Sequence, residues 1–214
     1  GKKPVFFGLD AKNDFYAKNI KNSGDGKVLA TLCFDNNNID VEIPAIGTYM
    51  VTNALAAAAA GKLLGLTDEE IANGVASYKT VGSRANVINT GKIKIIDDCY
   101  NANPTSVRAS LDTLSNLDGR KVAILGDMKE LGSEELKLHF DTGVYAKSKG
   151  IGTVITVGEL AKELAKGADG KAFDTIEDAK PEILKTIKSG DVVLVKASHS
   201  MQFENIVEFL KQNF

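Results

Sequence analysis

The chain has 214 residues, a formal net charge of −2, 43% hydrophobic residues and 25% charged residues. This length suffices for one large domain or two small ones, and the charge offers no broad basic field that would attract nucleic acid. The longest apolar run, ALAAAAAG, is too short to cross a bilayer, and the two cysteines, Cys33 and Cys99, match no metal-ligand spacing. We therefore expect a globular protein of the reducing cytoplasm.

The first 47 residues are predicted to be rich in β-structure. Short apolar runs alternate with the turn-forming segments NSGDGK and DNNN, a spacing typical of an antiparallel meander. The predicted strands are 5–9, 14–20, 27–35 and 38–47. Because the first run begins almost at the first residue, we expect the chain to be part of a longer protein.

Two helices are predicted next. The alanine-rich segment 48–65 has a helical composition, and Gly65 is suited to the position just after a helix end. The second helix covers residues 67–78, where Thr67 and Glu70 have the spacing of a capping box.

The segment KTVGSRAN, which contains Gly82 and Ser83, predicts a linker and a domain boundary between residues 82 and 83. Beyond it a hairpin is expected at 86–97, followed by strands that alternate with amphipathic helices. This alternation predicts an α/β fold with a mainly parallel sheet covered on both faces. The predicted strands are 94–98, 121–126, 153–158 and 191–198, and the predicted helices are 104–117, 133–149, 159–166, 177–188 and 202–211.

Polar side chains follow the first of these parallel strands, in the stretch DDCYNANPTS. Ligands of parallel sheets bind at the carboxyl ends of the strands. Asp98 is either a solvated strand end or a carboxylate that accepts the hydroxyls of a ribose, and the amide of Asn101 suits an adenine edge. Asn103 is expected to cap the helix that begins at Pro104, and Tyr100 is expected in the core rather than as a stacking platform.

Other strand ends also carry polar groups. Lys196 ends the last apolar strand, so its ammonium must reach solvent or meet an anion. Ser198 or Ser200 is expected to cap the last helix, and His199 alone is a weak signal. In the loop GDMKELG, Asp127 and Glu130 are either capping carboxylates or part of a site.

The second histidine, His139, lies in the middle of a predicted helix and is expected to be packed or on the surface. Two nucleotide motifs are missing from the 214 residues, the phosphate loop G-x-x-x-x-G-K-[ST] and the dinucleotide motif G-x-G-x-x-G.

Three stretches resemble a known family when they are taken together. DDCYNANPTS, GRKVAILGDMKELG and VLVKASHSM, in this order and spacing, are similar to the C-terminal part of the Mur ligases. Within this family the likeness is greatest to the member that adds D-alanyl-D-alanine. The resemblance covers residues 44–214 well and residues 1–43 loosely.

The resemblance implies that residues 1–82 end a central ATP-binding domain and that residues 83–214 form a Rossmann-like C-terminal domain. The implied reaction joins D-alanyl-D-alanine to UDP-N-acetylmuramoyl-tripeptide in peptidoglycan synthesis, through an acyl phosphate, with ATP and Mg²⁺ as cofactors. The phosphate loop and the magnesium ligands would lie outside this chain, which would then be inactive alone. The implied nucleotide contacts are Asn53, Arg84, Asp98 and Asn101, and the implied dipeptide contacts are Lys196, Ser198 and His199.

Two departures from the family pattern bear on these contacts. Tyr49 and Met50 stand where the family usually has His-Asn, and KASHS stands where it has KGSRS, so that His199 replaces an arginine. An imidazole cannot form the two-pronged carboxylate contact of a guanidinium.

Two alternatives from other classes are a stand-alone binding module without catalysis and a receiver-like signalling domain. A receiver would require an aspartate at the end of the third strand, where this sequence has Gly158.

Overall fold

Two compact units make up the chain, Gly1–Thr80 and Val81–Phe214, and each is described by itself. The domain boundary predicted from the sequence falls next to Val81, which lies outside the described residues. The computed structural model describes residues 3–23, 26–35, 37–80 and 82–214.

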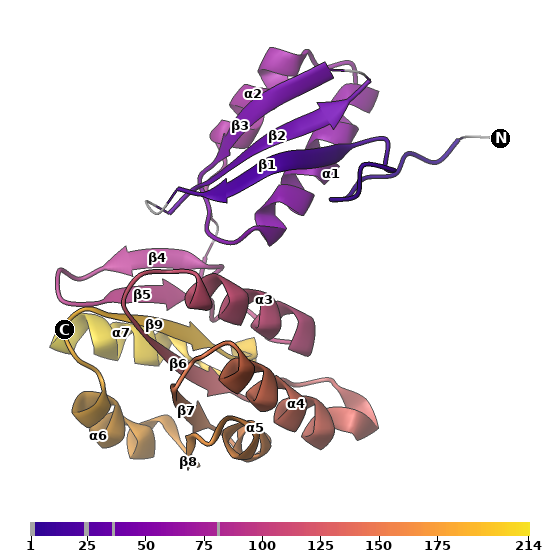
Figure 1. Cartoon of the computed structure of the whole chain (residues 1–214). Coiled ribbons are helices and arrows are strands. Elements are labelled where there is room, and N and C mark those ends of the chain that lie inside the picture. The colour runs from indigo at the N-terminus through magenta and orange to yellow at the C-terminus, as the bar shows by residue number, and fades with distance from the viewer. Residues whose placement is uncertain (1–2, 24–25, 36, 81) are drawn as a thin grey trace. The chain divides into compact units, whose positions relative to one another are not determined.

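A three-stranded antiparallel sheet, in the order β1-β2-β3, forms one layer of the first unit (Figure 1). This arrangement is the predicted meander. Alternate residues of β3 point inward, so that Val41 and Ile43 are buried while Glu42 is exposed. The strands are β1 (Tyr16–Asn22), β2 (Val28–Phe34) and β3 (Asn37–Ile43).

The prediction of a strand at residues 5–9 is wrong. The backbone there makes one isolated bridge, between Phe7 and Phe15, with hydrogen bonds from Gly8 N–H to Phe15 O and from Phe15 N–H to Phe6 O, each 3.0 Å long. Phe6 and Phe7 are exposed. The apolar run has no continuous partner strand, and a run of this length without one gains too few backbone bonds to form a strand.

Two helices, α1 (Tyr49–Leu63) and α2 (Asp68–Ala76), pack on this sheet. Gly65 follows α1 with a φ of +89°, as predicted for the residue after a helix end. The predicted capping box of α2 is also confirmed: Thr67 N–H donates to Oε2 of Glu70 at 2.8 Å, and Glu70 N–H donates to Oγ1 of Thr67 at 3.2 Å.

The second unit is built on a six-stranded sheet with the order β4-β5-β9-β6-β7-β8. β4 runs antiparallel to β5, and all other neighbours are parallel. Every residue of β9 is buried, which fits a central strand covered on both faces. The strands are β4 (Asn86–Asn89), β5 (Lys94–Asp97), β6 (Arg120–Gly126), β7 (Thr153–Val157), β8 (Lys171–Phe173) and β9 (Asp191–Lys196).

Helices cover both faces of this sheet, so the predicted α/β fold with a mainly parallel sheet is confirmed (Figure 1). The chain moves in one direction across the sheet from β6 through β7 to β8 and then returns to β9. Because crossovers are right-handed, the helices of the forward connections lie on one face of the sheet, and the helix of the return connection lies on the other. One face carries α3 (Pro104–Ser115), α4 (Glu135–Ser148) and α5 (Ala161–Ala168), and the other carries α6 (Ile176–Thr186) and α7 (Glu204–Asn213).

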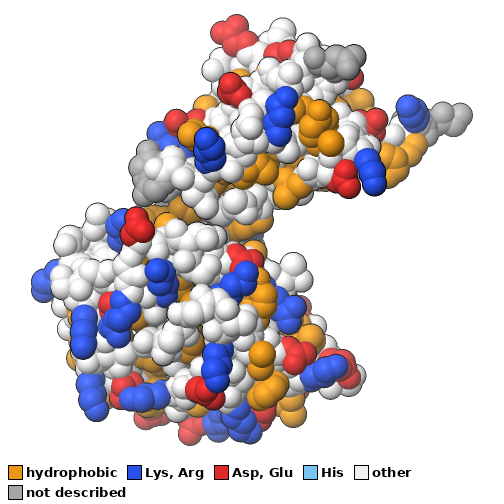
Figure 2. Space-filling view, in the orientation of Figure 1, with side chains coloured by type: hydrophobic (Ala, Val, Ile, Leu, Met, Phe, Trp, Pro, Cys, Tyr) orange, Lys and Arg blue, Asp and Glu red, His pale blue; other side chains and the backbone are white. Residues whose placement is uncertain are grey.

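The edge strand β8 was not predicted, because its three residues form no apolar run and none of them is buried. Lys and Arg side chains and Asp and Glu side chains are both visible on the face of the second unit that Figure 2 shows. In the described part of the chain no helix has both the length and the apolar character needed to span a bilayer.

Candidate functional site

A cleft lies at the carboxyl ends of three adjacent strands of the second unit, β5, β9 and β6. α3 leaves β5 on one face of the sheet and α7 follows β9 on the other, which is the kind of switch point where α/β sheets bind ligands. The cleft has a volume of about 590 Å³. Its lining comes from the loops that follow the three strands and comprises Tyr100, Asn101, Ala102, Asn103, Lys129, Glu130, Leu131, Ser198, His199 and Ser200.

A buried ion pair joins two of these strand ends. Nζ of Lys196 lies 2.6 Å from Oδ2 of Asp98 and 2.9 Å from the carbonyl oxygen of Asn101. Asp98 also accepts hydrogen bonds from Ser110 Oγ at 2.7 Å and from Ala85 N–H at 3.1 Å. Of the two alternatives expected for Lys196, solvent or an anion, the structure shows an anion, Asp98, and each oxygen of that carboxylate has a partner in the chain.

The loop after β5 carries Tyr100 on its surface. Tyr100 is 49% exposed, so the prediction that it belongs to the core is wrong. Its N–H donates to Ser83 O at 2.9 Å, which ties the loop to the segment before β4. The guanidinium carbon of Arg84 lies 3.7 Å from the centroid of the ring, and the ring of His199 lies 6.0 Å away.

The same loop ends in the predicted helix cap. Asn103 Oδ1 accepts the N–H of Ser106 at 2.8 Å, and Pro104 is the first residue of α3. The amide of Asn101 folds back, with Oδ1 accepting the N–H of Ala102 at 2.8 Å. The Asn101 carbonyl meets Lys196, while its side chain lines the cleft.

Ser198 connects the loop after β9 to the loop after β6. Its N–H donates to Asp127 O at 3.0 Å, and its Oγ accepts the N–H of Lys129 at 2.9 Å. The predicted cap of the last helix by Ser198 or Ser200 is wrong, because α7 begins at Glu204 and has no side-chain cap. A short 3₁₀ turn at His199–Met201 intervenes and displaces the helix start.

Asp127 is a buried capping carboxylate. Oδ1 accepts the N–H of Ala161 at the start of α5 at 2.8 Å, and Oδ2 meets Nζ of Lys129 at 2.7 Å. A Cβ on Gly158 would lie 2.4 Å from Oδ1 of Asp127, so the close approach requires glycine there. Glu130 is exposed, has a φ of +64° and lines the cleft.

His139, expected to be packed or on the surface, is fully buried. Its Nε2 accepts the N–H of Met128 at 2.9 Å, and its Nδ1 lies 2.7 Å from Glu135 O. Since Met128 N–H is a donor, Nε2 must be the acceptor, and Nδ1 carries the proton that it donates to Glu135 O. His139 thus fixes the loop after β6, a role that helical periodicity does not reveal.

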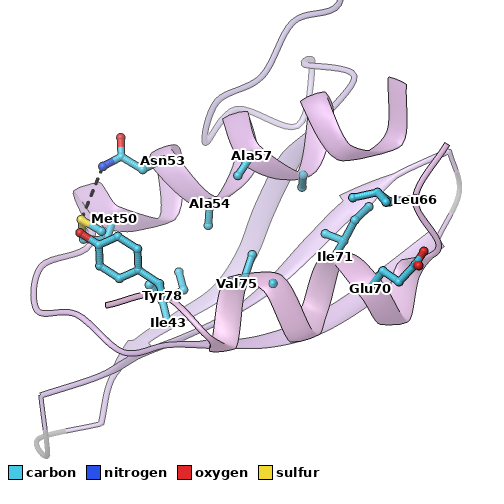
Figure 3. A pocket seen from close by; sticks show the side chains of 12 residues that line it. Ile43, Met50, Asn53, Ala54, Ala57, Leu66, Glu70, Ile71, Val75 and Tyr78 are labelled. Atoms are coloured by element: carbon cyan, nitrogen blue, oxygen red, sulfur yellow. Dashed lines mark hydrogen bonds between the residues drawn. The ribbon is translucent and has the colours of Figure 1, made fainter. Parts of the chain in front are cut away.

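Asn53 belongs to the other unit, where it is exposed on α1. It lies beside an apolar pocket of about 470 Å³ between α1 and α2, and its Nδ2 lies 3.5 Å from Sδ of Met50 (Figure 3). Tyr78 lies at the same end of this pocket as Met50 and Asn53, while Glu70 and Leu66 lie at the other end (Figure 3).

The site offers neither a reactive thiolate nor a metal-ligand cluster among the described residues. Burial raises the pKa of the Cys99 thiol, with Asp97 the next cause, so Cys99 is not a thiolate nucleophile at neutral pH. Among the described residues, no group of three or more His, Cys, Asp or Glu side chains is placed to hold a metal ion.

Comparison with known proteins gives two family matches. The Mur ligase, glutamate ligase domain matches residues 83–199, and the Mur ligase middle domain matches residues 1–61. UDP-N-acetylmuramoyl-tripeptide–D-alanyl-D-alanine ligase of Bacillus subtilis (strain 168) is 34% identical over 215 residues, covering 95% of this chain and 46% of the relative. The protein of the same name from Escherichia coli (strain K12) is 33% identical over 207 residues, with the same coverage.

Solved structures agree with these matches. MurF from Acinetobacter baumannii superposes with a TM-score of 0.89 at 30% identity, covering 96% of this chain and 46% of that one. MurF ligase from Thermotoga maritima in complex with ADP gives a TM-score of 0.86 at 27% identity, covering 98% and 48%. The chain spans about half the length of the relatives it matches.

Proposed function

Because the chain belongs to the Mur ligase family, we propose that it is part of an ATP-dependent ligase that adds D-alanyl-D-alanine to UDP-N-acetylmuramoyl-tripeptide. The chain would supply contacts to the nucleotide ribose and base and to the incoming dipeptide. Residues 1–82 would belong to the middle domain and residues 83–214 would form the C-terminal domain. The enzyme would work in the cytoplasm, where peptidoglycan precursors are made.

One observation carries the proposal: the cleft lies at the switch point of a unit that superposes on MurF, and polar groups from three strand ends line it. The relatives at 34% and 33% identity both bear the name of the D-alanyl-D-alanine-adding ligase. The likeness to an ADP complex of MurF supports a nucleotide as one ligand of the whole enzyme.

The proposed reaction has two steps. The carboxylate of the tripeptide attacks the γ-phosphorus of ATP, which gives an acyl phosphate and ADP. The amine of D-alanyl-D-alanine then attacks the acyl carbon, an amide forms, and inorganic phosphate and a proton leave. Positioning and charge stabilisation account for catalysis of this kind.

The roles of individual residues follow from the family resemblance. The nucleotide would be contacted by Asn53, Arg84, Asp98 and Asn101, and the dipeptide by Ser198 and His199. The resemblance also places Lys196 on the dipeptide side, but its ammonium is engaged by Asp98 and Asn101. Tyr100 joins the first group in our proposal because it is exposed and its ring stacks with the guanidinium of Arg84, which is also in that group. Magnesium would enter with ATP, and we assign it no ligand in this chain, because the described residues offer no suitable cluster.

Binding of the dipeptide to this chain tests the proposal without the rest of the enzyme. D-alanyl-D-alanine is added to isotope-labelled chain, and amide shifts are followed by NMR. We expect saturable shifts in the cleft, centred on Ser198 and His199, with a dissociation constant of about 1 mM or weaker, the regime of a few hydrogen bonds.

L-alanyl-L-alanine is the control, since it has the same charge and composition but the opposite stereochemistry. Shifts of equal size with both dipeptides, or shifts outside the cleft, would contradict a dipeptide site.

A further inference from the structure

Lys196 lies at the carboxyl end of β9 with its ammonium enclosed. The side chain is 3% exposed, and Nζ contacts Asp98 Oδ2 at 2.6 Å, Asn101 O at 2.9 Å and, at a longer distance of 3.5 Å, Asp98 O. A lysine ammonium has three donors, and these contacts account for all of them. No face of this group is left for a substrate.

We propose that Lys196 is a positioning residue: it holds the loop Asp98–Asn103, and through that loop the Arg84 and Tyr100 pair, and it does not itself bind substrate. This inference rests on the proposed function, in which Arg84 and Tyr100 contact the nucleotide. Lys196 would then support nucleotide binding through these residues, and only Ser198 and His199 would contact the dipeptide.

The contacts around Asp98 show how the Lys196 ammonium can hold Arg84 and Tyr100, which it does not touch itself. Oδ2 of Asp98 also accepts from Ser110 on α3, and Oδ1 accepts the N–H of Ala85. Ala85 has a φ of +53°, a backbone conformation that residues with a Cβ rarely adopt, so this bond helps to hold it. Arg84 immediately precedes Ala85, and its guanidinium stacks on Tyr100.

A second hydrogen bond joins the segment before β4 to the loop after β5. Tyr100 N–H donates to Ser83 O at 2.9 Å, so the segment 83–85 and the loop after β5 are joined at two points. Lys196 binds that loop at two residues, through the carboxylate of Asp98 and the carbonyl of Asn101. If the ammonium is removed, Asp98 becomes a buried carboxylate without its cation, which is strongly unfavourable.

The test uses the chain of 214 residues without any ligand. Lys196→Met is compared with Lys211→Met, which makes the same chemical change at an exposed lysine of α7 that is paired with Glu208. Hydrogen exchange is measured for amides of residues 99–103 and for amides of β6 and β7. The second readout is the ring-current shift of the Arg84 side-chain protons, which reports stacking on Tyr100.

For Lys196→Met we expect exchange in residues 99–103 to be faster by about tenfold or more, with loss of the Arg84 shift, while β6 and β7 keep their protection. Lys211→Met should change none of these. A folded Lys196→Met chain with native loop exchange and a native Arg84 shift overturns the proposal and returns Lys196 to a direct ligand role.

The double variant Lys196→Met, Asp98→Asn decides the outcome if the single variant unfolds or exchanges faster throughout, because it leaves no unpaired buried charge. Selective loss of loop protection and of the Arg84 shift in the double variant supports the proposal. Uniformly faster exchange, or failure of this variant to fold, overturns it, since Lys196 would then be a requirement of the whole unit. Because no ligand is added, these results do not depend on whether the chain takes part in ligation.

Discussion

His139 Nε2 accepts the backbone N–H of Met128 at 2.9 Å, and both side chains are completely buried. This bond joins α4 to the loop after β6, which forms one wall of the cleft. We expect His139→Leu to lower the free energy of unfolding of the second unit by about 1–3 kcal/mol, because Met128 N–H would be buried without an acceptor. Urea denaturation followed by amide signals of β6 measures this.

The other histidine provides the control for that change. His199 is exposed, so His199→Leu should alter the free energy of unfolding by no more than about 0.5 kcal/mol. Equal effects of the two substitutions would show that the bond between His139 and Met128 contributes nothing.

Asp98 is expected to matter for stability as well as for any ligand. Asp98→Ala should destabilise the second unit by about 3–5 kcal/mol, because it leaves the Lys196 ammonium buried and unpaired. The variant with both Asp98→Leu and Lys196→Met should regain most of this loss, since no charge is then buried. Urea denaturation of the unmodified chain, Asp98→Ala and the double variant measures the loss and its recovery, and a double variant as unstable as Asp98→Ala would argue against a desolvation effect.

The contact between α4 and α5 depends on glycine. A Cβ on Gly143 would lie 2.0 Å from the carbonyl oxygen of Leu164, a backbone atom that cannot move aside without moving α5. We expect Gly143→Ala to cost about 3 kcal/mol, the upper end for overpacking, in spite of the better helix propensity of alanine. Thermal unfolding measures the loss, and Gly152→Ala, where a Cβ meets nothing within 4 Å, should be close to neutral.

The capping box of α2 makes this helix sensitive to acid. The backbone N–H and hydroxyl of Thr67 hold the pKa of the Glu70 carboxyl below its usual range. Since the pKa in the folded chain is lowered, the stabilisation is present above the pKa of the unfolded chain and is lost as the pH falls through the folded value. An NMR titration of Glu70 Cδ should give a lower midpoint in the native chain than in Thr67→Ala, and equal midpoints would contradict this.

Phosphate chemistry is not expected from these 214 residues alone. Phosphoryl transfer needs backbone N–H groups around the β- and γ-phosphates, a lysine on them and a hydroxyl on magnesium, and the sequence has no phosphate-loop motif. The few contacts to adenosine must offset an association cost of at least about 4 kcal/mol. We therefore expect ATP to bind no tighter than about 1 mM, with no turnover.

Calorimetry with ATP and magnesium measures that affinity. A phosphate-release assay with UDP-N-acetylmuramoyl-tripeptide and D-alanyl-D-alanine measures turnover. Activity that persists through removal of contaminating enzymes would require a phosphate site elsewhere in the chain.

Local signals in the sequence were enough to predict much of the fold. Each of these signals determines the conformation of only a few neighbouring residues. They are the apolar runs of β5, β6, β7 and β9, the turn residues of the meander and the capping pair of α2. The Asn103–Pro104 pair, which begins α3, is a local signal of the same kind. Such signals depend on backbone conformation and side-chain periodicity, which a single segment contains in full. The isolated run at residues 5–9 shows the limit, because a strand also needs a partner that its own sequence does not specify.

Only the tertiary structure decided how the site residues combine. β9 enters the sheet between β5 and β6, and this insertion brings Lys196 to Asp98, 98 positions away in the chain. It also decided that Tyr100 is exposed under Arg84 and that His139 is bonded to Met128. These relationships depend on strand order and helix packing. Because both are set by the free energy of the whole unit, they cannot be predicted from a short segment of the sequence.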